Sequence, residues 1–173
     1  TADHGMNAKQ KADGTPNVLY IETMLTEQFG EGFRVICPIT DPYVKHHGAL
    51  GSYVAVHLPQ HADEAAVTTW LQQQAGITEV HNKAMAVRLL EQPEDRIADL
   101  VVLSARDVVV GRTPAHHDLS ALDSGLRSHG GRYEEMVPLL ISHPLRAEYK
   151  GKAAGDPRNF DVFDFTVNGT YFN

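Results

Sequence analysis

Apolar residues recur at helical spacing in three stretches of the chain. The first predicts a helix that Asn17 caps and Gly30 ends, with an apolar residue every three or four positions. The second covers residues 62–75, where two acidic residues favour the positive N-terminal end and a glycine follows the last turn. The third covers residues 83–91 and ends before a proline. Each of these helices has one apolar face to bury.

Short apolar runs between turn signals predict five strands. They cover residues 34–39, 52–58, 77–81, 99–103 and 107–111. We expect the last two to be a buried strand and its hairpin partner. Residues 137–142 predict a further strand, with Pro138 near its start in the position of an entry or an edge. Residues 112–136 are polar and loop-rich, and residues 159–173 fit a strand or a helix equally.

The order of these elements divides the chain into three parts. Between residues 34 and 91 it runs β-β-α-β-α, which is typical of a small α+β unit with its own sheet and helices on one face. Metal-binding residue types lie on both sides of this unit, at positions 3–4 and 129. The predicted organisation is residues 1–33 as a core segment with a metal motif, 34–98 as an inserted α+β cap, and 99–173 as a return to the core with a second metal motif. An extension of the main sheet also explains residues 34–98, so the pattern leaves the two interpretations, an inserted cap and a sheet extension, open.

The composition excludes several classes of protein. An apolar fraction of 42% and a charged fraction of 21% indicate a folded globular chain. A net charge of −7 provides no basic field for nucleic acid or an acidic membrane surface. No apolar run approaches the roughly 18 residues that cross a bilayer, and no signal-peptide pattern opens the chain, so the cytoplasm is the expected location. Cys37 is the single cysteine, so an internal disulfide is excluded. We expect its side chain to be a small, buried apolar group.

The first candidate metal ligands stand at the start of the chain. Asp3 and His4 are adjacent oxygen and nitrogen donors of the kind that zinc binds at about 2.0–2.2 Å. Gly5 lets the backbone bend so that both could serve one ion. The chain begins without methionine and places these residues where termini fray, which favours a piece of a longer polypeptide. Taken alone, an Asp-His pair is more often a surface turn than a pair of ligands.

A second candidate ligand lies much further along the chain. His129 is followed by Gly130 and Gly131, which let the backbone pass close to an ion or a phosphate while the histidine projects. His-Gly-Gly is also an ordinary turn sequence, so this motif is weak by itself. Only a tertiary fold could bring it to Asp3 and His4.

Taken together, the two motifs resemble metal-binding segments of the alkaline phosphatase superfamily. Thr1-Ala2-Asp3-His4-Gly5-Met6-Asn7 is similar to the superfamily's second metal motif. Arg127-Ser128-His129-Gly130-Gly131, followed by Glu134 and residues 137–141, is similar to its last metal-binding histidine and the core strand after it. Four more segments narrow the resemblance to the phosphonoacetate hydrolases. They are residues 38–43, 46–53, 99–102 and 117–120.

The resemblance implies an α/β fold, part of an alkaline-phosphatase-like sandwich with a small inserted α+β cap. It also implies two zinc ions, with Asp3 and His4 on the ion that holds a nucleophilic threonine and His129 on the other ion. In that family the threonine, the remaining ligands and the lysines that bind the substrate carboxylate lie upstream. No catalytic residue is therefore expected in this chain, and the missing N-terminal half of the same enzyme is an expected partner.

The implied reaction is hydrolysis of the carbon–phosphorus bond of phosphonoacetate, a small-molecule substrate, to acetate and phosphate by the intact enzyme. Two alternatives stay open. One is a nucleotide pyrophosphatase or phosphodiesterase of the same superfamily, and the other is a fragment without activity. The same oxygen and nitrogen ligands accept manganese or iron. A homodimer also stays open.

Five other residues carry weaker candidate chemistry. His46 and His47 lie in a glycine-rich turn and suit packing of the cap better than a third metal. His117 or Asp118 could orient a zinc-bound histidine through its second ring nitrogen. Arg127 fits a structural salt bridge better than a contact with a phosphonate.

Overall fold

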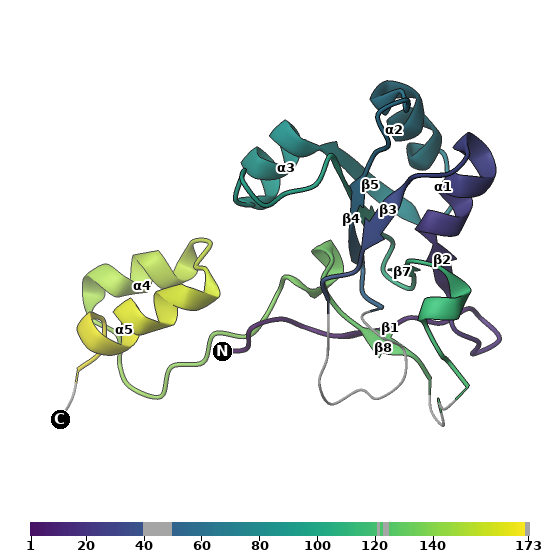
Figure 1. Cartoon of the computed structure of the whole chain (residues 1–173). Coiled ribbons are helices and arrows are strands. Elements are labelled where there is room, and N and C mark those ends of the chain that lie inside the picture. Colours follow the sequence, from purple (N-terminus) through teal and green to yellow (C-terminus); the bar gives the residue numbers. More distant parts are fainter. Residues whose placement is uncertain (40–49, 121, 123–124, 172–173) are drawn as a thin grey trace. The chain divides into compact units, whose positions relative to one another are not determined.

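The computed structural model of the chain describes residues 1–39, 50–120, 122 and 125–171. These residues form two compact units (Figure 1). The larger unit comprises residues 6–134, and the smaller one combines residues 1–5 with residues 135–173. Several small sheets and five α-helices make up the chain in its described part, so the predicted α/β class is confirmed. The sandwich and the inserted cap stay predictions.

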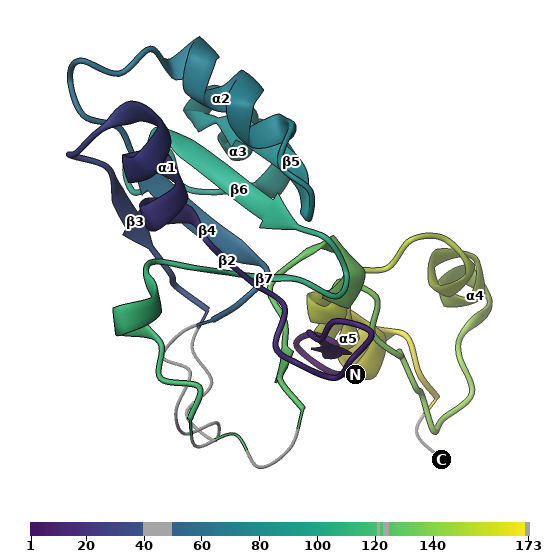
Figure 2. The ribbon, with the colours of Figure 1, turned by 90° about the vertical axis from the view of Figure 1, so that its right-hand side faces the viewer.

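A four-stranded antiparallel sheet is the centre of the larger unit (Figure 2). Its order is β3 (Arg34–Ile36), β4 (Tyr53–His57), β6 (Leu100–Ser104) and β5 (Ile77–Asn82). All five residues of β6 are buried, because this strand has a neighbour on each edge and a covered face on each side. The strands predicted near residues 34, 52, 77 and 99 are confirmed.

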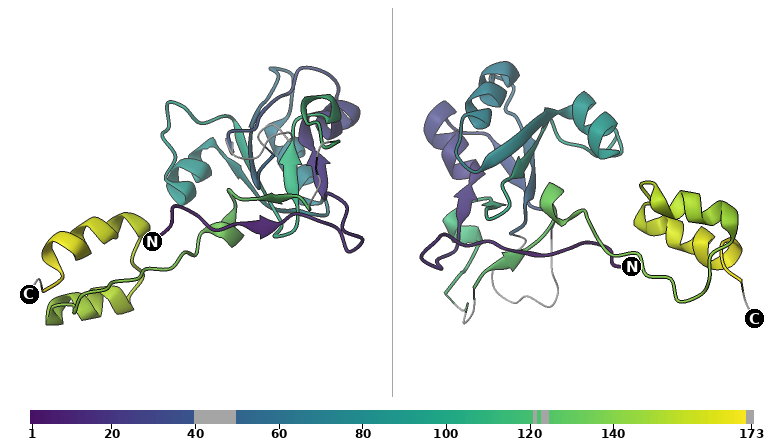
Figure 3. Two further views of the ribbon diagram at one scale, coloured as in Figure 1. Left: turned by 90° about the horizontal axis from the view of Figure 1, so that it is seen from below. Right: turned by 180° about the vertical axis from the view of Figure 1, so that it is seen from behind.

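Helices cover both faces of this sheet (Figure 1, Figure 3). On one face α1 (Ile21–Phe29) and α2 (Glu64–Gln72) pack with Val102 and its neighbours into one core. On the other face α3 (Lys83–Leu90) packs against Val101 and nearby residues in a second core. The expected arrangement, with helices on one face, is wrong because successive residues of a strand point to opposite faces and both sets in β6 are apolar.

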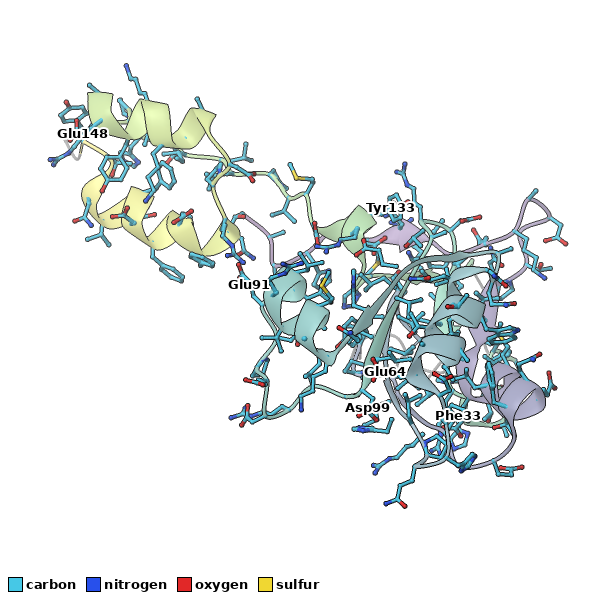
Figure 4. The ribbon with its side chains drawn as sticks, turned by 90° about the horizontal axis from the view of Figure 1, so that it is seen from above. Phe33, Glu64, Glu91, Asp99, Tyr133 and Glu148 are labelled. Atoms are coloured by element: carbon cyan, nitrogen blue, oxygen red, sulfur yellow. The ribbon has the colours of Figure 1, made fainter. Side chains whose placement is uncertain are left out.

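Side-chain caps explain where two of the helices begin. The Asp63 carboxylate accepts hydrogen bonds from the second and third backbone N–H groups of α2, and the Asn82 amide oxygen accepts one from Met85 in α3. Glu64 opens α2, and Glu91, with a left-handed φ of 53°, follows the last turn of α3 (Figure 4). The helices predicted over residues 62–75 and 83–91 are therefore confirmed.

Two sequence predictions are wrong at the edge of the larger unit. Asn17 does not cap α1, because residues 18–20 form strand β2 (Val18–Tyr20) before the helix starts. This strand pairs in parallel with β7 (Val109–Gly111), which the sequence had suggested as a hairpin partner of β6. Such a hairpin cannot form, since β4 and β5 already occupy both edges of β6. The loop-rich stretch after β7 contains the short helical turns η1 (Pro114–His116) and η2 (Arg132–Glu134).

The smaller unit is a pair of short helices. They are α4 (Ala147–Ala154) and α5 (Val162–Asn168), the latter preceded by η3 (Asn159–Asp161). The rings of Tyr149 and Phe165 meet edge to face with centroids 5.6 Å apart, and the Tyr149 hydroxyl donates to Asp164. The ambiguous tail is thus helical up to residue 168. No helix in the described part of the chain is long and apolar enough to span a membrane.

The strand predicted over residues 137–142 is absent from the smaller unit. The backbone of residues 137–142 is irregular, and Leu140 is 81% exposed. A strand is stable only where a neighbour shares its backbone hydrogen bonds, and none of the described residues pairs with this segment. The apolar composition of this segment predicted a strand, but composition does not show whether a neighbouring strand is available to pair with it.

Candidate functional site

Asp3 and His4 lie next to each other in the smaller unit with their donor atoms facing. The His4 Nε2 atom is 3.6 Å from the Asp3 Oδ2 atom; the Asp3 side chain is exposed and that of His4 is partly buried. The Asp3 carbonyl accepts a hydrogen bond from the Asn159 side chain, which ties the start of the chain to the η3 turn. The two predicted ligands are therefore placed together by the structure.

The geometry of this pair fits one zinc ion. The His4 Nδ1 atom is 2.8 Å from the Gly5 carbonyl oxygen, and since that oxygen can only accept, Nδ1 carries the hydrogen; in this tautomer of the neutral ring, Nε2 has the lone pair that a metal would bind. Two ligands at about 2.0–2.2 Å from a tetrahedral zinc lie roughly 3.3–3.6 Å from one another. The observed separation of 3.6 Å is at the upper end of that range.

The segment that follows these residues is paired with the segment that carries His129. Strand β1 (Asn7–Ala8) runs antiparallel to β8 (Arg127–Ser128), with Asn7 opposite Ser128 (Figure 1). The Lys9 N–H extends the pairing by donating to the Leu126 carbonyl at 2.8 Å. Residues that are far apart in the sequence, and that lie within two positions of the two motifs, are thus hydrogen-bonded neighbours within the larger unit.

Backbone contacts fix the loop around His129. The His129 carbonyl accepts from the Ser52 N–H at 2.8 Å, and the Ser128 hydroxyl donates to the Leu50 carbonyl at 2.5 Å. Gly130 has a φ of +98°, a conformation that favours glycine. A Cβ atom there would lie 2.7 Å from the side chain of Ile39, which also fills the space beside Gly51. The double glycine therefore serves close packing in this loop.

Replacement of Gly130 by alanine is expected to lower the free energy of unfolding by about 2–4 kcal/mol, because left-handed strain and overpacking add together. Gly14→Ala is the matched control. Gly14 has a similar φ of +83°, but a Cβ atom there meets nothing within 4 Å, so only the strain of about 1–2 kcal/mol is expected. Urea denaturation of both variants measures the difference. Equal losses would mean that the Ile39 contact does not constrain the loop.

A buried ion pair lies beside the paired strands, and the sequence analysis missed the lysine in it. Lys9 is fully buried and Glu134 is 2% exposed, with 3.0 Å between Nζ and Oε1. The ammonium group also donates to the Ser52 hydroxyl at 2.7 Å and to the Arg106 carbonyl at 2.8 Å. The side-chain amide of Asn7 donates to the same glutamate oxygen at 2.6 Å. A charged group so thoroughly buried is rare unless it is paired in this way.

Burial and hydrogen bonding act in opposite directions on the two partners. Burial lowers the pKa of Lys9, and the nearby Glu134 carboxylate only partly counteracts this effect. For Glu134, burial alone would raise the pKa, but hydrogen bonds from Asn7, Lys9 and the Gly131 N–H outweigh it and hold the pKa below its ordinary value. The carboxylate is therefore ionised at neutral pH.

The weaker candidates have ordinary structural contacts. The His117 Nε2 atom accepts from the Arg112 N–H at 2.8 Å, and its ring stacks on Tyr20. The Asp118 carboxylate accepts from the Ser120 N–H in a local turn. These contacts account for both residues, while a role beside a metal-bound histidine stays a prediction. Arg127 is exposed and forms no ion pair with any other described residue.

Cys37 is partly buried against the first core, and burial raises the pKa of its thiol to about 11, so it is protonated at neutral pH. This agrees with the predicted apolar role. His46 and His47 lie outside the described residues. Within the described residues no three or more histidine, cysteine, aspartate or glutamate side chains form a complete metal cluster.

Comparison with known proteins identifies the relatives of this fold. No protein-family model matches the chain. Two crystal structures of phosphonoacetate hydrolase from Sinorhizobium meliloti 1021 match the chain, one in complex with phosphonoformate and one with phosphonoacetate. In both comparisons the identity is 43%, the TM-score is 0.79, and the match covers 96% of this chain and 40% of the enzyme chain.

Identity at this level over nearly the whole chain means that the shared fold reflects common descent, and the relatives are hydrolases. Over this span the chain is similar in sequence and structure to phosphonoacetate hydrolase, which agrees with the resemblance of its motifs. It spans about two fifths of the length of the enzyme chains that it matches, 40% in each case.

Proposed function

We propose that this chain is part of an enzyme that hydrolyses the carbon–phosphorus bond of phosphonoacetate to acetate and phosphate. Its similar structures are phosphonoacetate hydrolases, one of them in complex with phosphonoacetate itself. In this proposal Asp3 and His4 bind one zinc ion and His129 binds a second. Bound zinc would polarise the phosphonate oxygens and lower the pKa of a coordinated hydroxyl or water.

The pairing of Asn7 with Ser128 is the observation that carries this proposal. Asn7 is two residues after the Asp3-His4-Gly5 motif, and Ser128 directly precedes His129. Neither motif is specific alone, because each also occurs as an ordinary turn. A fold that hydrogen-bonds their flanking residues to one another supports a shared function for them.

The remaining parts of the site would come from the part of the enzyme that this chain does not span. These parts are a nucleophilic threonine, the other zinc ligands and the lysines that bind the substrate carboxylate. The proposed partner is accordingly the N-terminal half of the same enzyme. The proposal depends neither on a location in the cytoplasm nor on a second copy of the chain.

A substrate panel tests the function. The protein that contains this chain together with the upstream half should release phosphate from phosphonoacetate and leave a nucleotide phosphodiester intact. Phosphate release is measured colorimetrically, and acetate is measured in the same samples to show that the carbon–phosphorus bond has broken. Preferential hydrolysis of the nucleotide would favour the pyrophosphatase or phosphodiesterase alternative instead.

The 173-residue chain alone is expected to retain fewer than two tightly bound zinc ions. Its proposed ligands give one ion two protein donors and the other ion one, whereas stable sites use three or four. Dialysis against zinc and then against buffer, followed by elemental analysis, gives the stoichiometry. Two tightly held ions per chain would contradict the proposed division of ligands.

A further inference from the structure

We propose that Lys9 and Glu134 are positioning residues, which fix the register between the segment leaving the Asp3-His4 motif and the loop that carries His129. The inference rests on the proposed function, because it assigns the pair a purpose in the two-metal site. Its structural part, the control of register, can be tested without zinc.

The network connects both segments through one carboxylate. Glu134 Oε1 accepts from the Asn7 amide at 2.6 Å and from the Lys9 ammonium at 3.0 Å, so it binds the segment around β1. Glu134 Oε2 accepts from the Gly131 N–H at 3.0 Å, so it binds the loop around His129. Movement of either segment along the other would break at least one of these bonds.

The Lys9 ammonium group is the second charged member of the network. Its three donor hydrogens have three acceptors, on Ser52, Arg106 and Glu134. Ser52 is also the residue whose N–H binds the His129 carbonyl at 2.8 Å. One side-chain hydrogen bond, from Lys9 to Ser52, and one backbone hydrogen bond, from Ser52 to His129, therefore connect the lysine to the backbone of the candidate ligand.

Stability alone does not explain a buried ion pair at this point. Removing two charges from water is costly, and well-packed apolar residues of similar volume often stabilise a protein as much or more. A fully hydrogen-bonded polar network does something that an apolar cluster does less well, since it permits only one arrangement of its partners. Control of register is the role that fits this location, where paired strands adjoin two candidate metal motifs.

Lys9→Met and the double variant Lys9→Met/Glu134→Met test the proposal. Hydrogen exchange of the 173-residue chain reports on register through the amides of Lys9 or its replacement, Ser52 and Gly131, with the Lys83 amide as reference. In the single variant the three reporters should exchange at least about tenfold faster relative to the reference. Zinc affinity of the protein with the full ligand set, measured by chelator competition, should fall about 10- to 100-fold, as for other outer partners of metal ligands.

The double variant separates positioning from stability. It should regain most of the thermal stability lost in the single variant, because no charge is left buried and unpaired. Exchange at Gly131 and the loss of zinc affinity should persist, because the carboxylate acceptor is gone. Recovery of both zinc affinity and amide protection in the double variant would overturn the proposal.

Two further measurements keep the result interpretable. Should Lys9→Met fail to fold, Glu134→Gln retains the shape of the side chain and one acceptor oxygen, and the same reporters apply. Glu22→Gln is the matched control, because Glu22 pairs with Arg112 at 2.9 Å but makes no contact with the network. It should leave the three reporter amides unchanged. If the wild-type protein binds no zinc, the proposed function fails, whereas the exchange data still decide the question of register.

Discussion

His129→Ala is expected to lower the rate of phosphonoacetate hydrolysis by the complete enzyme more than about 100-fold. Loss of an outer partner of a metal ligand already costs 10- to 100-fold, and loss of a direct ligand removes part of the charge stabilisation itself. The zinc content should fall from two ions to one. Steady-state kinetics and elemental analysis of the same preparation measure both quantities.

His116→Ala is the control for this experiment. His116 is exposed, and its Nδ1 atom is 2.7 Å from the Thr113 hydroxyl. The variant should keep both its zinc and its activity. Full activity in His129→Ala with two ions still bound would refute the assignment of this histidine as a ligand.

Glu134→Ala is expected to destabilise the larger unit by about 3–5 kcal/mol, because it leaves the Lys9 ammonium buried without its counter-charge. A loss of this size is a large fraction of the 5–15 kcal/mol that stabilises a typical domain. Denaturant unfolding followed by the fluorescence of Trp70, which packs against the first core, reports on this unit.

Glu79→Ala provides a matched comparison in the same unit. Glu79 pairs with Arg132 at 3.0 Å, the same N–O distance as in the Lys9–Glu134 pair. Its side chain is 26% exposed and that of Arg132 is 34% exposed, against 1% and 0% for the buried pair. Water can replace the lost partner, so a smaller destabilisation is expected. Equal losses in the two variants would show that burial is not the deciding factor.

Acid titration gives the buried pair a second signature. The pKa of Glu134 is lowered from its ordinary value of 4.5 in the folded chain, so its stabilising contribution is complete above pH 4.5 and is lost as the pH falls below that value. The unfolding free energy of the wild type should therefore decline in this range. In Glu134→Ala this part of the decline should be absent.

Elements with local signals could be predicted from the sequence. The helices α2 and α3 were predicted because their apolar spacing and their end signals, acidic residues and Gly76 for α2 and Pro93 for α3, lie within short segments. The pairing of β7 could not be found in this way. Its partner β2 is distant in sequence, and the preference for it arises because both edges of β6 are already occupied.

The candidate site shows the same limit. Asp3, His4 and His129 were proposed as ligands because their motifs contain glycines and resemble those of a known family. Lys9 was missed because a lysine in a loop with nearby glycines usually lies in water. Its burial depends on Glu134, far along the chain, and the sequence pattern does not link the two residues.

The contact of Ile39 with both Gly51 and Gly130 has a consequence for how this chain can change. The three positions share one small volume, so a methyl group gained at either glycine must be compensated by a smaller residue at position 39. Substitutions at positions 39, 51 and 130 should therefore be correlated in sequences that descend from this one. A change at one of them alone should be rare.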